Sequence, residues 1–301
     1  MRAAAVAMAE SWLSTLSHDS AIATAATLMR AAYIVGFAAT SNLEAGRRWG
    51  IPTMGTAAHS WTLLHDTEED AFRAQIEALG VGTTLLVDTY DIRRGVETAV
   101  RIAGTGLGGV RIDSGDLPTV AAEVRAQLDE LGATGTRITV TSDLDEYAIA
   151  ALAASPVDAY GVGTSVVTGS GTPTAGMVYK LVARQGDDGG WVGVAKASTD
   201  KGSKGGRKAA FRTLDDGTAT SELIVVSDGF EALDTGASHP GARPLQVALV
   251  TDGAPDTAFE CTAGVEAARA HHARVREELP VRALALSRSD PAIPTVYADA
   301  E

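Results

Sequence analysis

Short apolar runs alternate with helix-like stretches through the first half of the chain. The runs are YIVGF (33–37), IPTMG (51–55), TLLVD (84–88), GVRID (109–113), ITVTSD (138–143) and AYGVG (159–163). This alternation is typical of parallel βα units. The last four runs follow one another at intervals of about 20 to 30 residues, the length of one strand and its returning helix. The pattern predicts an α/β fold, an irregular and incomplete TIM-like barrel, because a closed barrel asks for about eight strands.

The two ends of the chain carry different patterns. Residues 4–32 are rich in Ala, Leu and Met, with caps in SHDSA, and predict two helices. After Thr174 the segments become short, alternating and turn-bounded, which is typical of antiparallel β structure. A last helix is expected in TAGVEAARAHHARVREELP. The predicted parts are N-terminal helices (1–32), an α/β-barrel catalytic domain (33–175), and a smaller β-rich domain with a C-terminal helix and tail (176–301).

Composition indicates a globular protein and narrows its partners. Of the 301 residues, 45% are hydrophobic and 21% charged, enough to bury a sizeable core. The net charge of −13 has the wrong sign for a protein whose main partner is nucleic acid. A local basic pocket could still hold phosphates, because it acts over a few ångströms.

Cysteine usage and hydropathy bear on the compartment. Cys261 is the only cysteine, so neither an intrachain disulfide nor a cysteine metal cluster is expected. The first twenty residues lack a signal-peptide pattern, and no run reaches about 18 uninterrupted apolar residues. We expect a cytoplasmic protein without a membrane segment.

Charged and polar residues follow the predicted strands. His59 lies in the loop GTAAHSW, Asp88 and Asp91 in VDTYDI, and Arg111 and Asp113 in VRIDSGDLP. The carboxyl ends of barrel strands meet at one mouth, so these side chains are expected to converge there. Taken singly, each has an ordinary structural interpretation: a hydrogen-bonded structural histidine in a loop, an ion pair of Arg111 with Asp113 or Asp88, or a helix cap, which we expect of Asp91.

Five motifs in order resemble those of the nicotinate phosphoribosyltransferase family of type II phosphoribosyltransferases. They are GTAAHSW, LLVDTYDI, GVRIDSGDL, TSDLDEYAI and YGVGTSVVTGS. The resemblance is close over residues 16–215 and looser beyond. It implies transfer of a phosphoribosyl group from phosphoribosyl pyrophosphate to nicotinate in NAD biosynthesis, with Mg²⁺ and with ATP as co-substrate through a phosphohistidine. A homodimer is also implied.

The resemblance assigns roles residue by residue. His59 matches the phosphorylated histidine, Asp88 would orient its ring, and Asp113 would serve the ribose hydroxyls directly or through Mg²⁺ held by substrate or water. The strand-end loops would hold the 5′-phosphate, and Asn42 matches a position near nicotinate, although a helix cap explains it equally well. A Gly-rich loop with Lys201, Lys204, Arg207 and Lys208 resembles one that reaches a phosphate site. The residues expected to bind substrate are Asn42, Thr56, Arg111, Ser142, Asp143, Gly161, Gly163, Thr164 and Lys204.

The sequence also departs from the family pattern. A DxYxLT motif is not found, and TLMR (27–30) runs directly into AAYIVGF where the family carries a Gly-x-Arg-Arg segment. These departures keep two alternatives open. One is a catalytically silent or truncated homologue that binds phosphoribosyl pyrophosphate or a nucleotide. The other is a related nicotinamide or quinolinate phosphoribosyltransferase, although quinolinate enzymes need no phosphohistidine.

Overall fold

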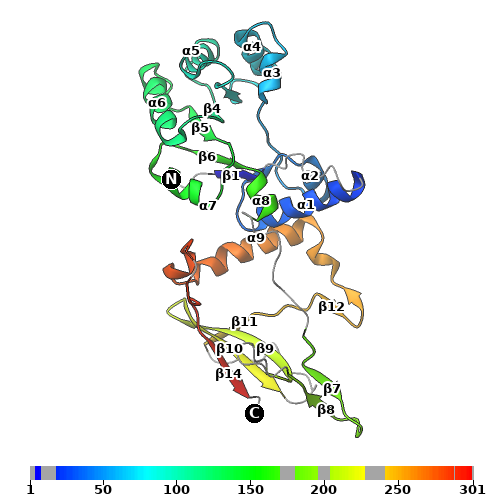
Figure 1. Ribbon diagram of the computed structural model, residues 1–301. Coiled ribbons are helices and arrows are strands. Elements are labelled where there is room, and N and C mark those ends of the chain that lie inside the picture. Colours follow the sequence, from blue (N-terminus) through cyan, green and yellow to red (C-terminus); the bar gives the residue numbers. More distant parts are fainter. Residues whose placement is uncertain are drawn as a thin grey trace. The chain divides into compact units, whose positions relative to one another are not determined.

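A computed structural model describes residues 4–7, 18–169, 180–195, 204–227, 241–287 and 289–299. The chain divides into two compact units (Figure 1). The first comprises Met1–Thr174 with Glu260–Arg269, and the second Ala175–Phe259 with Ala270–Glu301. Helix α9 (Thr262–Glu277) therefore begins in the first unit and ends in the second.

The first unit is built on one parallel sheet. Besides the start of α9, the helices and strands of this unit are β1 (Ala4–Ala7), α1 (His18–Ile34), β2 (Ala39–Thr40), α2 (Leu43–Trp49), α3 (His59–Leu63), α4 (Glu68–Leu79), β3 (Thr84–Leu86), α5 (Ile92–Ala103), β4 (Gly109–Ile112), α6 (Leu117–Glu130), β5 (Arg137–Val140), α7 (Glu146–Ala151), the 3₁₀ turn η1 (Leu152–Ala154), β6 (Ala159–Val162) and α8 (Thr164–Thr168). The strand order is β2-β1-β6-β5-β4-β3, and every pair is parallel. The predicted α/β fold with a parallel sheet is confirmed. Among the described residues β2 and β3 do not pair with each other, so the sheet is open there.

Alternation along the strands separates a helix-covered face from a polar face. Val110 and Ile112 of β4 are fully buried in the main core, with apolar residues of α5 and α6, while Arg111 between them points to the opposite face. Figure 1 shows α4, α5 and α6 side by side along the sheet. Every second side chain of β4 therefore packs in the core, and the side chains between them are available to form a site on the opposite face of the sheet.

A glycine brings one helix unusually close to the strand that leads into the site. A Cβ built on Gly95 of α5 would lie 2.4 Å from the carbonyl oxygen of Val87, so only glycine fits this contact. Asp91, just before α5, accepts a hydrogen bond from the Arg94 amide at 2.9 Å. The expected capping role of Asp91 is confirmed, and the loop after β3 is fixed at both ends.

A second core joins α1, α2 and the start of α9. It contains Met29, Trp49 and Val265. The Arg269 guanidinium donates to the carbonyl oxygens of Tyr33 and Phe37, the latter at 2.7 Å, and lies 4.2 Å from the centre of the Tyr33 ring. A cation thereby donates to carbonyl groups at and just beyond the C-terminal end of α1, where the helix dipole favours positive charge.

Three predictions for the N-terminal region are wrong. Residues 4–7 form β1 between β2 and β6, because strand pairing outweighs the high helix propensity of alanine. The run 33–37 is not a strand: α1 continues to Ile34, and its apolar residues Tyr33 and Phe37 pack in the second core. In the run 51–55 only Thr53 forms a bridge, to Thr40, where Pro52 cannot donate a ladder hydrogen bond.

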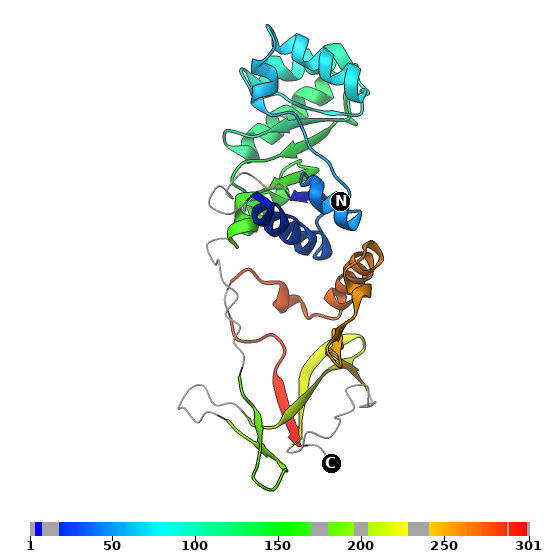
Figure 2. The ribbon, with the colours of Figure 1, turned by 90° about the vertical axis from the view of Figure 1, so that its right-hand side faces the viewer.

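The second unit is rich in short strands. Its elements besides the end of α9 are β7 (Ala183–Gln185), β8 (Trp191–Gly193), β9 (Arg207–Asp215), β10 (Thr218–Ser227), β11 (Ala242–Pro244), β12 (Val250–Thr251), β13 (Ala254–Pro255), η2 (Thr257–Phe259), η3 (Val281–Leu284) and β14 (Thr295–Asp299). The largest sheet has the order β11-β9-β10-β14, with β10 and β14 parallel. Figure 2 shows the long β9–β10 hairpin in yellow-green and yellow. Its turn, Asp216–Gly217, has positive φ at both positions, as the favoured two-residue hairpin requires. In the described part of the chain no helix is long and apolar enough to cross a membrane.

Candidate active site

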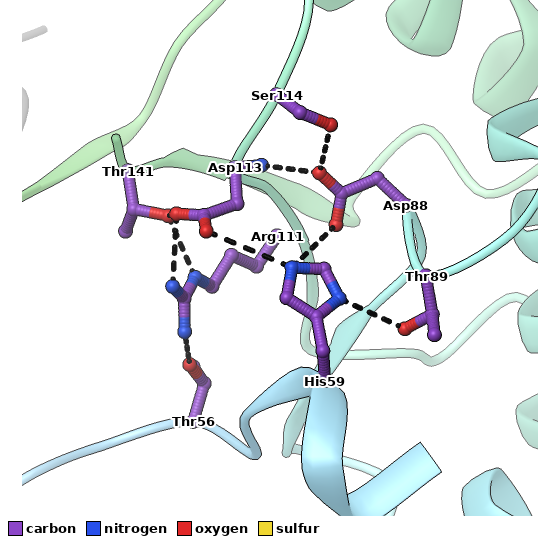
Figure 3. Close-up of polar contacts among 8 residues, drawn as sticks. All are labelled: Thr56, His59, Asp88, Thr89, Arg111, Asp113, Ser114 and Thr141. Atoms are coloured by element: carbon purple, nitrogen blue, oxygen red, sulfur yellow. Dashed lines mark hydrogen bonds and ion pairs between the residues drawn. The ribbon is translucent and has the colours of Figure 1, made fainter. Parts of the chain in front are cut away.

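The predicted strand-end residues meet around His59 (Figure 3). His59 is the first residue of α3, and Asp88 and Asp113 lie just beyond β3 and β4. Leu86 pairs with Arg111, and Arg111 with Thr139. Continued by two residues, this register sets Asp88 beside Asp113 and Asp113 beside Thr141. The carboxyl ends of three neighbouring strands therefore form one polar row, where open α/β sheets place their ligands.

Asp88 is a fixed and buried carboxylate. Its Oδ2 accepts hydrogen bonds from the Asp113 amide at 2.8 Å and from the Ser114 hydroxyl at 2.7 Å. Its Oδ1 is also buried but accepts no hydrogen bond from the described residues. An unsatisfied buried acceptor costs about 1–3 kcal/mol. The nitrogen Nε2 of His59 lies 3.9 Å from this Oδ1, so the imidazole is placed to relieve the cost.

His59 lies between two carboxylates and a hydroxyl. Its Nε2 is 3.7 Å from Oδ2 of Asp113 and its Nδ1 is 3.1 Å from Oγ1 of Thr89. The side chain is 39% exposed. A histidine whose two nitrogens face different partners while its ring stays accessible is suited to accept or transfer a group.

Arg111 is buried and makes three hydrogen bonds to side chains. Its Nε donates to Thr141 Oγ1 at 2.7 Å, Nη1 to Thr56 Oγ1 at 2.7 Å, and Nη2 to Asp113 Oδ1 at 3.0 Å. Of the two ion pairs considered from the sequence, the structure shows the one with Asp113. Arg111 thereby links the His59 loop, through Thr56, to the ends of β4 and β5.

These contacts keep Asp113 ionised. Burial by itself raises the pKa of Asp113, but hydrogen bonds from Thr141 and Arg111 and the positive charge of Arg111 lower it more strongly. The net pKa lies below the ordinary aspartate value. At neutral pH the site therefore holds a carboxylate at Asp113, available for hydroxyl groups or for a cation.

A cavity of about 210 Å³ opens beside this cluster. Its lining residues are Arg111, Asp113, Thr141, Ser142, Asp143, Gly161, Gly163 and Thr164. All of them except Thr141 were singled out in the sequence. Ser142 has φ 116°, a conformation that costs a non-glycine residue about 1–3 kcal/mol and that tends to occur at functional sites.

Other predicted residues lie elsewhere or have structural partners. Thr56 contacts the site through Arg111. Asn42 caps α2, its Oδ1 accepting from the Ala45 amide at 2.8 Å. Lys204 belongs to the second unit, where its ammonium lies 4.9 Å from the centre of the Tyr297 ring, and Lys201 falls outside the described residues.

Two hydroxyl residues of the site, Thr89 and Thr141, were missed, and a third, Ser114, was noted in VRIDSGDLP without a role. Thr89 contacts His59, Ser114 donates to Asp88, and Thr141 donates to Asp113. Each stands directly beside a residue that was singled out, in VDTYD, RIDSG and TSDLD. Hydroxyl residues within one or two positions of a strand-end carboxylate were the available signal: Thr89 and Ser114 directly follow Asp88 and Asp113, and Thr141 stands two positions before Asp143.

Comparison with known proteins identifies the family. No protein-family model matches the chain. The chain is 47% identical over 329 residues to nicotinate phosphoribosyltransferase pncB1 of Mycobacterium tuberculosis, covering 94% of this chain and 68% of that protein. It is 40% identical over 203 residues to the Bacillus subtilis nicotinate phosphoribosyltransferase, covering 64% of this chain and 41% of that protein.

Solved structures share the fold. Human nicotinic acid phosphoribosyltransferase matches with a TM-score of 0.65 and 24% identity, over 97% of this chain and 68% of that one. Nicotinate-nucleotide pyrophosphorylase from Pyrococcus furiosus matches with a TM-score of 0.66 and 20% identity, over 92% and 66%. The sequence identity and coverage confirm the resemblance seen in the motifs, and the chain belongs to the nicotinate phosphoribosyltransferase family.

Proposed function

We propose that this chain is a nicotinate phosphoribosyltransferase, which forms nicotinate mononucleotide and pyrophosphate from nicotinate and phosphoribosyl pyrophosphate. The observation that carries the proposal is the row of Asp88, Asp113 and Thr141 around His59, beside a cavity lined by Gly161 and Gly163. It stands in a chain of which 94% aligns with relatives of that name at 47% identity.

The cavity suits the phosphoribosyl donor. In the transfer, the bond from ribose C1 to pyrophosphate breaks, pyrophosphate leaves with the electron pair, and the pyridine nitrogen supplies the pair for the new bond. The sugar becomes cationic as the leaving group departs, so an ionised carboxylate nearby stabilises it. Asp113 is that carboxylate in the proposal, and the backbone of the loops at Ser142 and Gly163 would receive the 5′-phosphate.

The site residues fit Mg²⁺ that is held mainly by substrate. Among the described residues, no group of three or more His, Cys, Asp or Glu is arranged to hold a metal. Mg²⁺ keeps several waters and commonly binds through one or two carboxylates and substrate phosphates. Asp113 offers such a carboxylate at the cavity. The ion would supply neutralisation of the pyrophosphate charge.

His59 is proposed to couple the reaction to ATP. A ring nitrogen would attack the γ-phosphorus of ATP, and ADP would leave with the electrons of the broken P–O bond. The phosphorylated ring carries a positive charge, which the carboxylates of Asp88 and Asp113 at 3.9 and 3.7 Å from Nε2 would stabilise.

A product assay tests the proposal. The purified chain is incubated with nicotinate, phosphoribosyl pyrophosphate and Mg²⁺, with and without ATP, and nicotinate mononucleotide is followed by chromatography. We expect product, and more of it with ATP. Parallel incubations with nicotinamide or quinolinate in place of nicotinate decide between the related transferases. If a mononucleotide forms only from nicotinamide or only from quinolinate, that compound is the acceptor and nicotinate is not.

A silent homologue is the second candidate. It is favoured by the missing Gly-x-Arg-Arg segment between Arg30 and Ala31 and by the open edge of the described sheet. Tight binding of phosphoribosyl pyrophosphate without turnover, measured by calorimetry on folded protein, would establish it. The TIM-like barrel, the β-rich second domain and the homodimer remain proposals that accompany the assignment as a nicotinate phosphoribosyltransferase.

A further inference from the structure

The two nitrogens of the His59 ring face groups of different chemistry. Nε2 faces the carboxylates of Asp88 and Asp113, at 3.9 and 3.7 Å. Nδ1 faces the neutral hydroxyl of Thr89 at 3.1 Å. Figure 3 shows these contacts on opposite sides of the ring. A neutral imidazole has one N–H and one lone pair, so these surroundings decide which nitrogen carries the proton.

The carboxylates favour a proton on Nε2. Oδ1 of Asp88 is buried and, within the described part of the chain, has no hydrogen-bond donor, and Asp113 is held ionised by Arg111. A lone pair on Nε2 would face two negatively charged oxygens, whereas an N–H there would be attracted to both. With the proton on Nε2, Nδ1 keeps its lone pair and can accept a hydrogen bond from the Thr89 hydroxyl.

We infer that Thr89 is a positioning residue, which together with Asp88 holds His59 as the Nε2–H tautomer by donating its hydroxyl proton to Nδ1. Asp88 and Thr89 are consecutive residues, so one short segment of the chain places a partner beside each nitrogen of the ring. Asp88 itself is anchored by Ser114 and by the Asp113 amide. The basic lone pair of His59 therefore lies on Nδ1, beside a neutral hydroxyl.

A role of Thr89 in catalysis rests on the proposed function of His59. The tautomer of His59 can be measured independently of that function. Protein labelled with ¹⁵N in histidine, without any ligand, gives distinct signals for protonated and unprotonated ring nitrogens. H59N removes the His59 signals and so assigns them. At a pH where the ring is neutral, we expect a protonated Nε2 and an unprotonated Nδ1.

Three variants test the hydroxyl. T89V keeps the shape of the side chain, and we expect the tautomer ratio to fall about five- to tenfold, the equilibrium effect of one hydrogen bond. T89S should restore the wild-type ratio. T136V is the matched control, because Thr136 is buried and donates its hydroxyl to the Leu107 carbonyl at 3.0 Å, without a contact to His59 among those described. Its spectrum should be that of the wild type at His59.

Each outcome decides one point. A proton on Nδ1 in the wild type would overturn the inference without any variant. An unchanged ratio in folded T89V would show that the carboxylates act alone and would remove Thr89 from the mechanism. If the ratio shifts as expected but no nicotinate mononucleotide forms, the tautomer stands and the proposed function fails. If ATP stimulates transfer, T89V should lose most of that stimulation and T89S should recover it.

Discussion

Replacing Arg111 by methionine should destabilise the first unit at neutral pH and do so less in acid. The variant removes three hydrogen bonds and leaves Asp113 without its cation. Methionine has a similar length and can fill the apolar part of the space. The loss therefore comes from the polar contacts and not from a large cavity.

The expected magnitude is about 2–3 kcal/mol. Breaking a fully buried ion pair by removing one partner costs about 3–5 kcal/mol. The Asp113 side chain is 29% exposed, so water recovers part of this cost. The free threonine hydroxyls can also turn to other partners. With a urea slope of about 2–3 kcal/mol per molar for a unit of this size, the midpoint should fall by about 1 M.

The pH dependence follows from the pKa of Asp113. In the wild type this pKa is lowered, so its contribution to stability is present above the unfolded pKa and is lost as pH falls through the folded value. In R111M the burial of Asp113 is no longer opposed by Arg111, so its pKa rises. Protonation then relieves the unpaired charge, and the difference between R111M and wild type should shrink as pH falls from 7.5 to 4.5.

Urea unfolding followed by tryptophan fluorescence measures this difference, since Trp49 and Trp61 lie in the first unit. R137M is the control, because Arg137 is exposed and on the neighbouring strand, and its loss should change stability by less than about 0.5 kcal/mol. R111K should fall between wild type and R111M. Equal midpoints for R111M and wild type, or a difference that grows in acid, would refute the reasoning.

Further predictions concern a helix cap, the proposed chemistry and assembly. N42A should lose about 1 kcal/mol of stability in urea through the cap of α2 while N42D keeps it, and equal losses would contradict a cap. H59A should abolish stimulation by ATP but leave slow ATP-independent transfer, and unchanged stimulation would remove His59 from that role. D113A should damage transfer itself, which full turnover in the same assay would disprove. Light scattering should give twice the chain mass of 30.9 kDa, and a monomer would rule out the proposed homodimer.

The strands that carry the site could be predicted from the sequence because each combines apolar residues that pack in the core with polar residues of the site at its carboxyl end. In β3 to β6 the helix-facing positions are apolar, and three of the runs continue into Asp88, Asp113 or Asp143 at the sheet edge. Parallel strands covered by helices give such runs at regular spacing. Fold class and the cavity-lining residues other than Thr141 followed from that spacing and from the family motifs.

The N-terminal region was not readable in the same way. A short apolar run such as 33–37 has the same composition in a buried helix end as in a strand. Its state is decided by partners far along the chain, since Tyr33 contacts Glu266 and Arg269 of α9. Likewise β1 is a strand because β2 and β6 flank it, and no local signal in AAVA gives that.

The register in which neighbouring strands pair decides which strand-end residues meet, and the hydrophobic periodicity of the sequence does not predict that register. The pairs Leu86 with Arg111 and Arg111 with Thr139 carry Asp88, Asp113 and Thr141 into one row. A slip of one residue in β4 would turn Asp113 toward the helices and Ile112 toward the cavity. That slip is prevented by Val110 and Ile112, which are fully buried in the main core. The packing of two apolar side chains on one face of β4 therefore also aims the carboxylate on the other face at His59.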